Sequence, residues 1–459
     1  MKNYRLTNSW DAVNPDAPAK ARMLAHIQQA QQGPVAHRPR WPWVAGAAAL
    51  LVAVAVIVGV VTSGRAPAGP SLPARDLMAN LQAGNVKASA PDAKFTQAMA
   101  DFSVGLLQQQ ASNEKNVLVS PLSVQLALAM TANGASRETL LQMQKVLGEG
   151  ADINDINAML AGYVKGLPST DKAKFHLANS IWFRQQQGFN VEQKFLQTNA
   201  DYYGAGAYAA PFDQSTVDAI NAWVNENTDG MVPKIIDDLQ PDDMMVLLNA
   251  LAFDAEWMIP YLDPQVSDGI FTASSGARQN AKFMASSEYT YLDDGKATGF
   301  VKPYADRGYN FVALLPNEGV SMSDYVASLS GDGWLTTMGS ATTDMVQAQL
   351  PEFSFSYDAS LVKALKAMGM TDAFDPEFAQ FRDMAQPPPA LYIGNVVHST
   401  SISVTPVGTR AGAATAAIMA ASGMALEPKV VTLDRPFVFA ITDATTNLPV
   451  FIGVTNSVA

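Results

Sequence analysis

The chain contains no cysteine among its 459 residues. Disulfide bonds, thiolate nucleophiles, cysteine-ligated zinc and iron–sulfur clusters are therefore excluded. Histidine is also scarce: the chain has four, and only His176 and His398 lie beyond residue 91. The lack of cysteine fits a bacterial export route more readily than a eukaryotic secreted protein of this length.

Motifs of catalytic sites are missing as well. The sequence holds no Gly-x-Ser-x-Gly elbow, no His-Glu-x-x-His pair, no phosphate-binding loop and no Rossmann glycine pattern. Asp293-Asp294-Gly295 lacks the other ligands of a calcium-binding EF-hand, so a surface turn is the better interpretation. His398 has no local motif that would support a Ser-His-Asp triad. We predict a protein that is not an enzyme and has no metal or cofactor.

Positive charge is in deficit. Lys and Arg number 30 against 42 Asp and Glu, which gives a net charge of −12 and a pI near 4.8. No basic face could dominate this balance, so we predict that nucleic acid is not a partner. Hydrophobic residues make up 48% of the chain, which is enough for a large core and argues against disorder.

An apolar, uncharged run occupies residues 41–63. At ~1.5 Å per residue, such a helix approaches the ~30 Å needed to cross a bilayer. Trp41 and Trp43 stand where an interfacial aromatic anchor is expected, and Arg38 and Arg40 precede the run. These features predict a single membrane span with its N-terminal side in the cytoplasm.

The chain is thereby divided into four predicted segments. Residues 1–40 form a cytoplasmic tail, 41–63 a transmembrane anchor, 64–91 a Pro/Ala/Gly linker, and 92–459 one domain at the cell surface or in the periplasm. A long signal peptide is the alternative for the apolar run. It is disfavoured by the long polar stretch before the run and by the lack of a convincing cleavage motif.

Helix and strand patterns in the domain predict an α+β fold. Residues 123–133 are too apolar for a surface helix, and Gly134 is expected to end this buried helix in the left-handed conformation. Another helix begins near Ser136. Strands are predicted for the runs 244–253, 311–315, 391–397, 430–433, 437–442 and 450–455. Helices come mainly early and strands mainly late, which favours α+β over a doubly wound sheet.

The stretch 408–417 is built of small residues and carries one charge. Small side chains fit between two strands without a void or a clash. If the stretch becomes a strand, Thr409 and every second residue after it face one side, while Arg410 faces the other. Burying an unpaired guanidinium would cost several kcal/mol, so this parity favours an insertable loop over a flexible linker or an Ala-rich helix.

Several motifs, in order along residues 92–459, resemble the serpin family. They are Asn116-x-x-x-Ser120-Pro121-x-Ser123, Asn221-x-Trp223-Val224-Asn225, Leu248-Asn249-Ala250 followed by Trp257, Leu350-Pro351-Glu352-Phe353, Arg435-Pro436-Phe437 and Phe451-Ile452-Gly453. Asp254-Ala255 departs from the Lys-Gly that is common in the family.

The resemblance implies a serpin fold, with three β-sheets, about nine helices and an exposed reactive-centre loop. By position it implies a "shutter" of Ser120, Ser123, Asn249 and His398 beneath the centre of the main sheet, and Trp257 in the "breach" at its top. Hydroxyls, an amide and an imidazole can exchange hydrogen-bond partners when two strands part. Trp257 also fits an ordinary core aromatic.

The resemblance also implies a hinge at the start of the loop. Its residues are Gly408, Thr409, Arg410, Ala411, Gly412, Ala413, Ala414 and Thr415. Pro406 and Arg410 stand where glutamate is frequent in the family. Proline removes an N–H and restricts a strand end, so its effect on the hinge stays open.

The bait bond is placed by two counts along the loop. Counting forward from Gly408 gives the Ser422–Gly423 bond, and counting back from the closing motif gives Ala425–Leu426. The candidates are Ser422, Gly423, Met424 and Ala425. Met424 suits an elastase- or chymotrypsin-like pocket, and the lack of Lys and Arg across 419–426 disfavours a trypsin-like target.

The function implied by the resemblance is that of a monomeric suicide inhibitor. A target serine protease of the elastase, chymotrypsin or subtilisin type would be trapped as a covalent acyl-enzyme when the loop inserts into the main sheet. The alternative is a non-inhibitory serpin acting as a binding or chaperone module. Such serpins tend to carry bulky or charged hinge residues, and the alanines of 411–417 argue against this.

Overall fold

The computed structural model describes residues 74–186, 189–240, 243–386, 391–409 and 427–458. No helix in these ranges is both long and apolar enough to span a bilayer. The predicted anchor, residues 41–63, lies outside the described residues.

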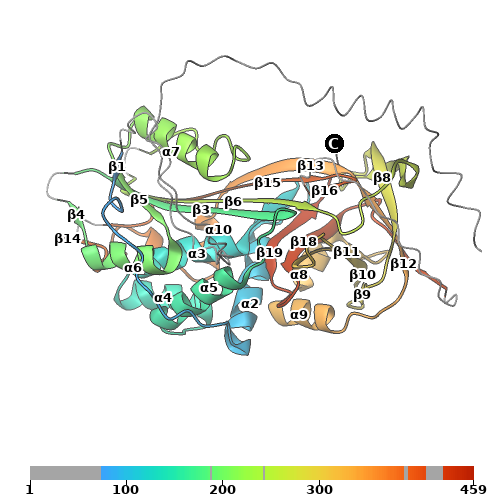
Figure 1. Cartoon of the computed structure of the whole chain (residues 1–459), viewed down its shortest axis with the longest axis horizontal. Helices are drawn as coiled ribbons and strands as arrows, with labels where there is room; N and C mark the ends of the chain where they lie inside the picture. Colours follow the sequence, from blue (N-terminus) through green and yellow to red (C-terminus); the bar gives the residue numbers. More distant parts are fainter. Residues whose placement is uncertain (1–73, 187–188, 241–242, 387–390, 410–426, 459) are drawn as a thin grey trace, which may run out of the picture. The chain divides into compact units, whose positions relative to one another are not determined.

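Nine α-helices occur among the described residues (Figure 1). They are α2 (Ala93–Gln110), α3 (Pro121–Ala132), α4 (Arg137–Gly148), α5 (Ile153–Gly166), α6 (Gln193–Tyr203), α7 (Gln214–Asn227), α8 (Met322–Ser328), α9 (Gly331–Gly339) and α10 (Val362–Ala367).

The largest sheet, here called sheet A, has seven strands in the order β1-β5-β3-β6-β16-β15-β13. Its strands are β1 (Arg75–Asp76), β3 (Ala173–Arg184), β5 (Gly206–Ala210), β6 (Met245–Glu256), β13 (Phe353–Ser360), β15 (Asn395–Val404) and β16 (Gly408–Thr409).

Sheet B has six strands in the order β2-β19-β18-β11-β10-β9, and sheet C has four in the order β17-β12-β8-β7. The strands of sheet B are β2 (Val117–Val119), β9 (Tyr291–Asp293), β10 (Ala297–Pro303), β11 (Tyr309–Pro316), β18 (Phe437–Asp443) and β19 (Pro449–Thr455). Those of sheet C are β7 (Val266–Thr272), β8 (Arg278–Glu288), β12 (Val346–Pro351) and β17 (Lys429–Thr432). A small pair joins β4 (Asn190–Val191) to β14 (Ala385–Gln386). The α+β architecture with three main sheets is therefore confirmed.

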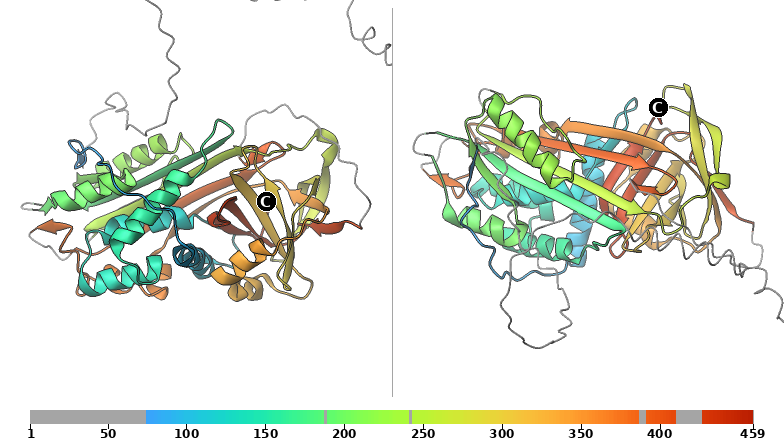
Figure 2. Two further views of the ribbon diagram at one scale, coloured as in Figure 1. Left: turned by 60° about the horizontal axis from the view of Figure 1, so that its bottom comes forward. Right: turned by 45° about the horizontal axis from the view of Figure 1, so that its top comes forward.

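Helices cover both faces of sheet A (Figures 1 and 2). On one face, α7 buries Ile220 and Val224 against Val246 and Leu248 of β6. On the other face α3 packs beneath β3 and β6. Sheet A therefore has apolar contacts on both sides, and its central strands are near-continuously hydrophobic for that reason.

Helix α3 is buried over its whole length, as its apolar sequence predicts. The expectation for Gly134 was wrong, however. Asn133 ends the helix in the right-handed region, and Gly134 has no positive φ. A Cβ on Gly134 would lie only 2.6 Å from Cβ of Met384. Glycine is needed here for the close approach of two chain segments, not for a left-handed turn.

Strand β15 begins at Asn395, later than the predicted run that starts at 391. Ile393 is buried, but its N–H donates to the carbonyl of Ala373 outside any sheet. Apolar composition therefore extended the predicted strand into a buried connection, because burial and strand pairing leave the same mark on a sequence.

Residues 74–91, within the predicted linker, pack against the domain. Strand β1 pairs antiparallel with β5 at the edge of sheet A, and the Ser89 N–H donates to the Ala158 carbonyl over 3.0 Å. Gly162 permits this contact, since a Cβ there would lie 2.0 Å from the Ser89 oxygen.

Candidate functional site at the centre and top of sheet A

Strands β6 and β15 close the centre of sheet A. They pair in parallel, with His398 opposite Asn249. Both side chains are fully buried. Any strand added to the middle of this sheet would have to separate this pair.

A chain of hydrogen bonds crosses the sheet at this point. The Ser120 N–H donates to His398 Nε2 over 3.1 Å, and His398 Nδ1 lies 2.8 Å from Asn249 Oδ1. The Asn249 amide in turn donates to Asn179 Oδ1 over 2.9 Å. Because Nε2 accepts, the proton of the neutral imidazole is assigned to Nδ1. The structure thus joins three of the residues proposed from sequence with one more, Asn179.

Burial lowers the pKa of His398 to about 3, so the imidazole is neutral near pH 7. Ser120 caps α3, and its Oγ accepts the Ser123 N–H over 3.4 Å. Ser123 Oγ is buried and has no hydrogen-bond partner among the described residues. Ser123 therefore lies beside this polar chain rather than within it.

The top of sheet A already holds the first two residues of the predicted hinge. After β15 the chain makes a tight turn, in which the Thr405 N–H donates to the Gly408 carbonyl over 2.9 Å. It then returns as β16, where Thr409 lies opposite Ala255 on one side and Val404 on the other. Thr409 is buried, and its Oγ1 is 2.6 Å from the Tyr304 hydroxyl. The inward face expected for Thr409 is observed.

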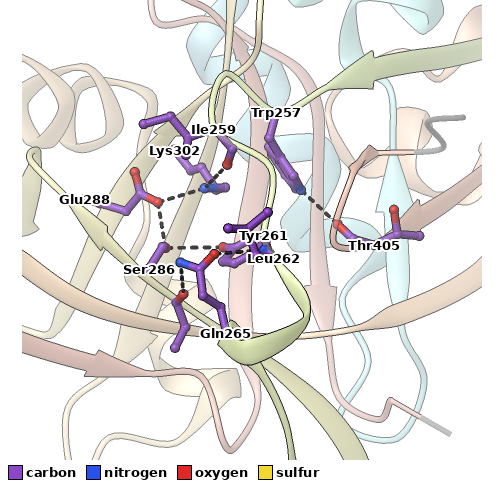
Figure 3. Close-up of polar contacts among 10 residues, drawn as sticks. Trp257, Ile259, Tyr261, Leu262, Gln265, Ser286, Glu288, Lys302 and Thr405 are labelled. Carbon is purple, nitrogen blue, oxygen red and sulfur yellow. Dashed lines mark hydrogen bonds and ion pairs between the residues drawn. The ribbon is translucent and has the colours of Figure 1, made fainter. Parts of the chain in front are cut away.

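Trp257 directly contacts this turn (Figure 3). Its indole Nε1 donates to the Thr405 carbonyl over 2.8 Å, and its backbone N–H donates to the Val407 carbonyl over 2.9 Å. The ring stacks on Tyr304 with centroids 4.7 Å apart. Trp257 is thus a core aromatic and also a direct partner of the hinge base.

Pro406 occupies the apex of the same turn. Its carbonyl accepts the Tyr261 N–H over 2.8 Å. A proline here leaves no strand hydrogen bond unmade, because the turn requires no donor at that position. The departure from the family pattern is accommodated by local geometry.

Strands β6 and β15 keep one register along their length. Across β16, Ala255 and Val404 both lie opposite Thr409, and further down Val246 lies opposite Asn395. The offset is 149 residues in both places (404 − 255 and 395 − 246). The two strands can therefore be parted by an extra strand without sliding along each other.

The other loop residues predicted from the sequence lie outside the described residues. They are Arg410, Ala411, Gly412, Ala413, Ala414, Thr415, Ser422, Gly423, Met424 and Ala425. The described chain resumes at Glu427 and enters sheet C as β17.

Sequence reasoning missed several polar side chains around the site. Asn179 extends the central hydrogen-bond chain, Tyr304 meets Thr409, and Lys302 forms a buried ion pair with Glu288. Lys302 had a visible signal, since it is the one charge in the otherwise uncharged strand 297–303. Asn179 and Tyr304 had none, because each needs its tertiary neighbour to stand out.

The fold and this site are those of a serpin. The family model described as "Serpin (serine protease inhibitor)" matches residues 97–458, and the chain belongs to that family.

Among solved structures, the chain is 45% identical to the thermophilic serpin tengpin in its native state. The match covers 84% of this chain and 99% of that one, with a TM-score of 0.80. Tengpin in its latent state matches at 42% identity, 81% and 100% coverage and a TM-score of 0.72. A curated relative, an uncharacterised serpin-like protein of Thermococcus kodakarensis, is 29% identical over 78% of this chain and 84% of its own length.

Proposed function

We propose that the chain is a suicide inhibitor of serine proteases that acts by inserting residues 410–419 between β6 and β15. The carrying observation is β16: the hinge has already entered the gap by two residues, in a register that continues down the sheet. The greater similarity to native than to latent tengpin supports a loop that is still largely uninserted.

Extending the register places each further loop residue. Thr415 would lie six residues beyond Thr409, opposite Asn249 on β6 and His398 on β15. Its side chain would face inward, as Thr409 does. A hydroxyl arriving there can bond with the amide or the imidazole as they separate. This supports a shutter role for Ser120, Asn249 and His398, with the spare Ser123 hydroxyl available for exchange.

The same register places Arg410 on the outer face of sheet A. It would lie opposite Asp254 of β6, which is only partly buried. Opposite charges directly across two strands are favourable by roughly 0.2–1 kcal/mol. Arg410 therefore does not oppose insertion, and Asp254 replaces the more common lysine in a way that suits it.

The chemistry begins with the protease. Its serine attacks the carbonyl of the bait bond, the peptide bond breaks, and the new amino terminus leaves while an ester joins loop and enzyme. The freed hinge then adds a strand to sheet A by β-augmentation. The protease is displaced with the loop before water can hydrolyse the ester, so the native state must be held by a kinetic barrier.

Incubation with elastase-, chymotrypsin- and subtilisin-like enzymes tests the proposal. We expect an SDS-stable complex with at least one of them, and the mass of the released C-terminal peptide identifies the bond among Ser422, Gly423, Met424 and Ala425. Clean cleavage without a complex by all three would contradict inhibition and favour the binding or chaperone alternative.

We further propose, from the sequence alone, that residues 41–63 tether the domain outside a bacterial cytoplasm. Membranes washed with alkaline carbonate should retain the full chain, whereas a chain starting at residue 68 should be released. Release of both forms would contradict the tether and leave the inhibitor proposal untouched.

A further inference from the structure

The segment from Trp257 to Tyr261, which connects β6 to sheet C, holds the base of the hinge through three successive carbonyls (Figure 3). The Thr405 oxygen accepts from the Trp257 indole over 2.8 Å. The oxygens of Pro406 and Val407 accept the backbone N–H groups of Tyr261 and Trp257 over 2.8 and 2.9 Å. The turn that produces β16 is therefore only as rigid as this segment.

That segment is itself fixed by one cation from sheet B. Lys302 Nζ donates to Glu288 Oε1 over 2.9 Å and to the Ile259 carbonyl over 3.3 Å. It also lies 4.3 Å from the ring centroid of Tyr261 and 5.4 Å from that of Trp257. One ammonium group thus contacts the beginning, middle and end of the segment.

The pair is almost completely buried. The side chains of Lys302 and Glu288 are 3% and 9% exposed, and Glu288 also accepts from Ser286 Oγ. Burial by itself opposes the charge, but Tyr261 and Glu288 outweigh it and raise the pKa of Lys302. Buried ion pairs contribute little net stability compared with well-packed apolar residues. What the pair does contribute is a fixed geometry.

A preformed turn matters because strand insertion needs a nucleus. Ordering the backbone of each residue costs about 1–2 kcal/mol before new pairing compensates for it. The turn 405–408 and strand β16 are already ordered between their neighbours. The loop therefore has only to extend an existing hairpin rather than form one.

We propose that Lys302 and Glu288 are positioning residues for loop insertion: they fix the segment 257–261, which holds the turn 405–407 and keeps β16 in place as the nucleus for the inserting strand. Neither residue contacts the loop beyond Thr409 or the protease. This inference rests on the proposed inhibitory function, and it adds a determinant of insertion rate outside the hinge and the shutter.

The test is the double variant Lys302→Met with Glu288→Leu, which removes both charges and keeps side-chain volume. The matched control is Lys282→Met with Asp268→Leu, which removes an exposed ion pair from sheet C. Hydrogen exchange of the Trp257 and Tyr261 amides reports on the hinge base without any protease. The stoichiometry of inhibition reports on the race between insertion and hydrolysis. The urea midpoint reports on overall stability.

In the double variant we expect these two amides to exchange about tenfold faster, which corresponds to ~1.4 kcal/mol of local opening. The Ser120 amide, which bonds to His398, should exchange at the wild-type rate. The stoichiometry of inhibition should rise several-fold while the urea midpoint stays unchanged. The control should match the wild type in all three measurements.

Unchanged exchange at Trp257 and Tyr261 would overturn the inference. So would faster exchange throughout the domain with a lower urea midpoint, because that outcome indicates a merely structural pair. If the wild type itself forms no complex with any protease, the proposed function fails, while the exchange experiment still decides whether the pair fixes the hinge base.

Discussion

His398 shows how one buried side chain can make sheet A sensitive to pH. Its Nε2 accepts a backbone N–H and its Nδ1 donates to Asn249, so a second proton has no acceptor and would break the contact with Ser120. The imidazole can therefore take part in the closed sheet only while it is neutral.

The sign of the pH dependence follows from the two pKa values. The folded value is about 3 and the ordinary value 6.5, so between them the unfolded chain binds the extra proton. The stabilisation is complete above about pH 6.5 and is lost as the pH falls toward 3, at up to ~1.4 kcal/mol per pH unit. Urea midpoints measured between about pH 5 and 7 should show this slope.

A glutamine in place of His398 separates this histidine from the others. His398→Gln can still accept from Ser120 and donate to Asn249, and we expect the slope to become flatter. His176→Gln, at the partly exposed contact with Asp229, serves as the control and should keep the wild-type slope. An unchanged slope in His398→Gln would show that other groups carry the pH dependence.

At the scale of elements, the hairpin formed by β15 and β16 sets which loop residues become buried. Continuing the register places Ala413 opposite Leu251 and Thr400, whose side chains are fully buried. Ala414 would then point away from this core. The two neighbouring alanines thus form a natural matched pair.

We expect Ala413→Glu to convert the inhibitor into a substrate, because an unpaired buried carboxylate costs several kcal/mol and stalls insertion. Its stoichiometry of inhibition should rise about tenfold or more, since a barrier change of ~1.4 kcal/mol already has that effect. Ala414→Glu should inhibit almost as well as the wild type. Equal effects of the two substitutions would show that the inserted strand does not follow this register.

The comparison of sequence with structure is also clearest among elements. Motifs with fixed spacing brought Ser120, Asn249 and His398 to one site, because each motif sits on an element whose position the family fold determines. The role of Lys302 could not be predicted in this way. Its partner Glu288 comes from sheet C and its aromatic contacts from the segment after β6, so only tertiary packing joins them.

Gly134 illustrates the opposite limit. A glycine at a helix end favours a left-handed cap in general, yet here the neighbour Met384 explains it. Local rules cannot tell conformational freedom from lack of space, because both select glycine. The predicted tail and anchor, 1–63, and the hinge beyond Thr409 stay predictions.

For the molecule as a whole, a native state held by a barrier should become more stable when the loop is cut. Inserting about ten residues adds roughly ten backbone hydrogen bonds at ~1 kcal/mol each. At ~2 °C per kcal/mol for a large domain, the melting temperature should rise by about 20 °C. Calorimetry before and after cleavage within 419–426 measures this change, and an equal or lower melting temperature would contradict insertion.

The common register of β6 and β15 has a mechanical consequence. Sheet A resembles a plate with a notch at one edge, and the tip of the notch lies at Thr409 between Ala255 and Val404. As the notch advances, each lost contact between the two strands is replaced by contacts on both sides of the wedge. A split of this kind feeds itself, so the protein has only to guard its first step.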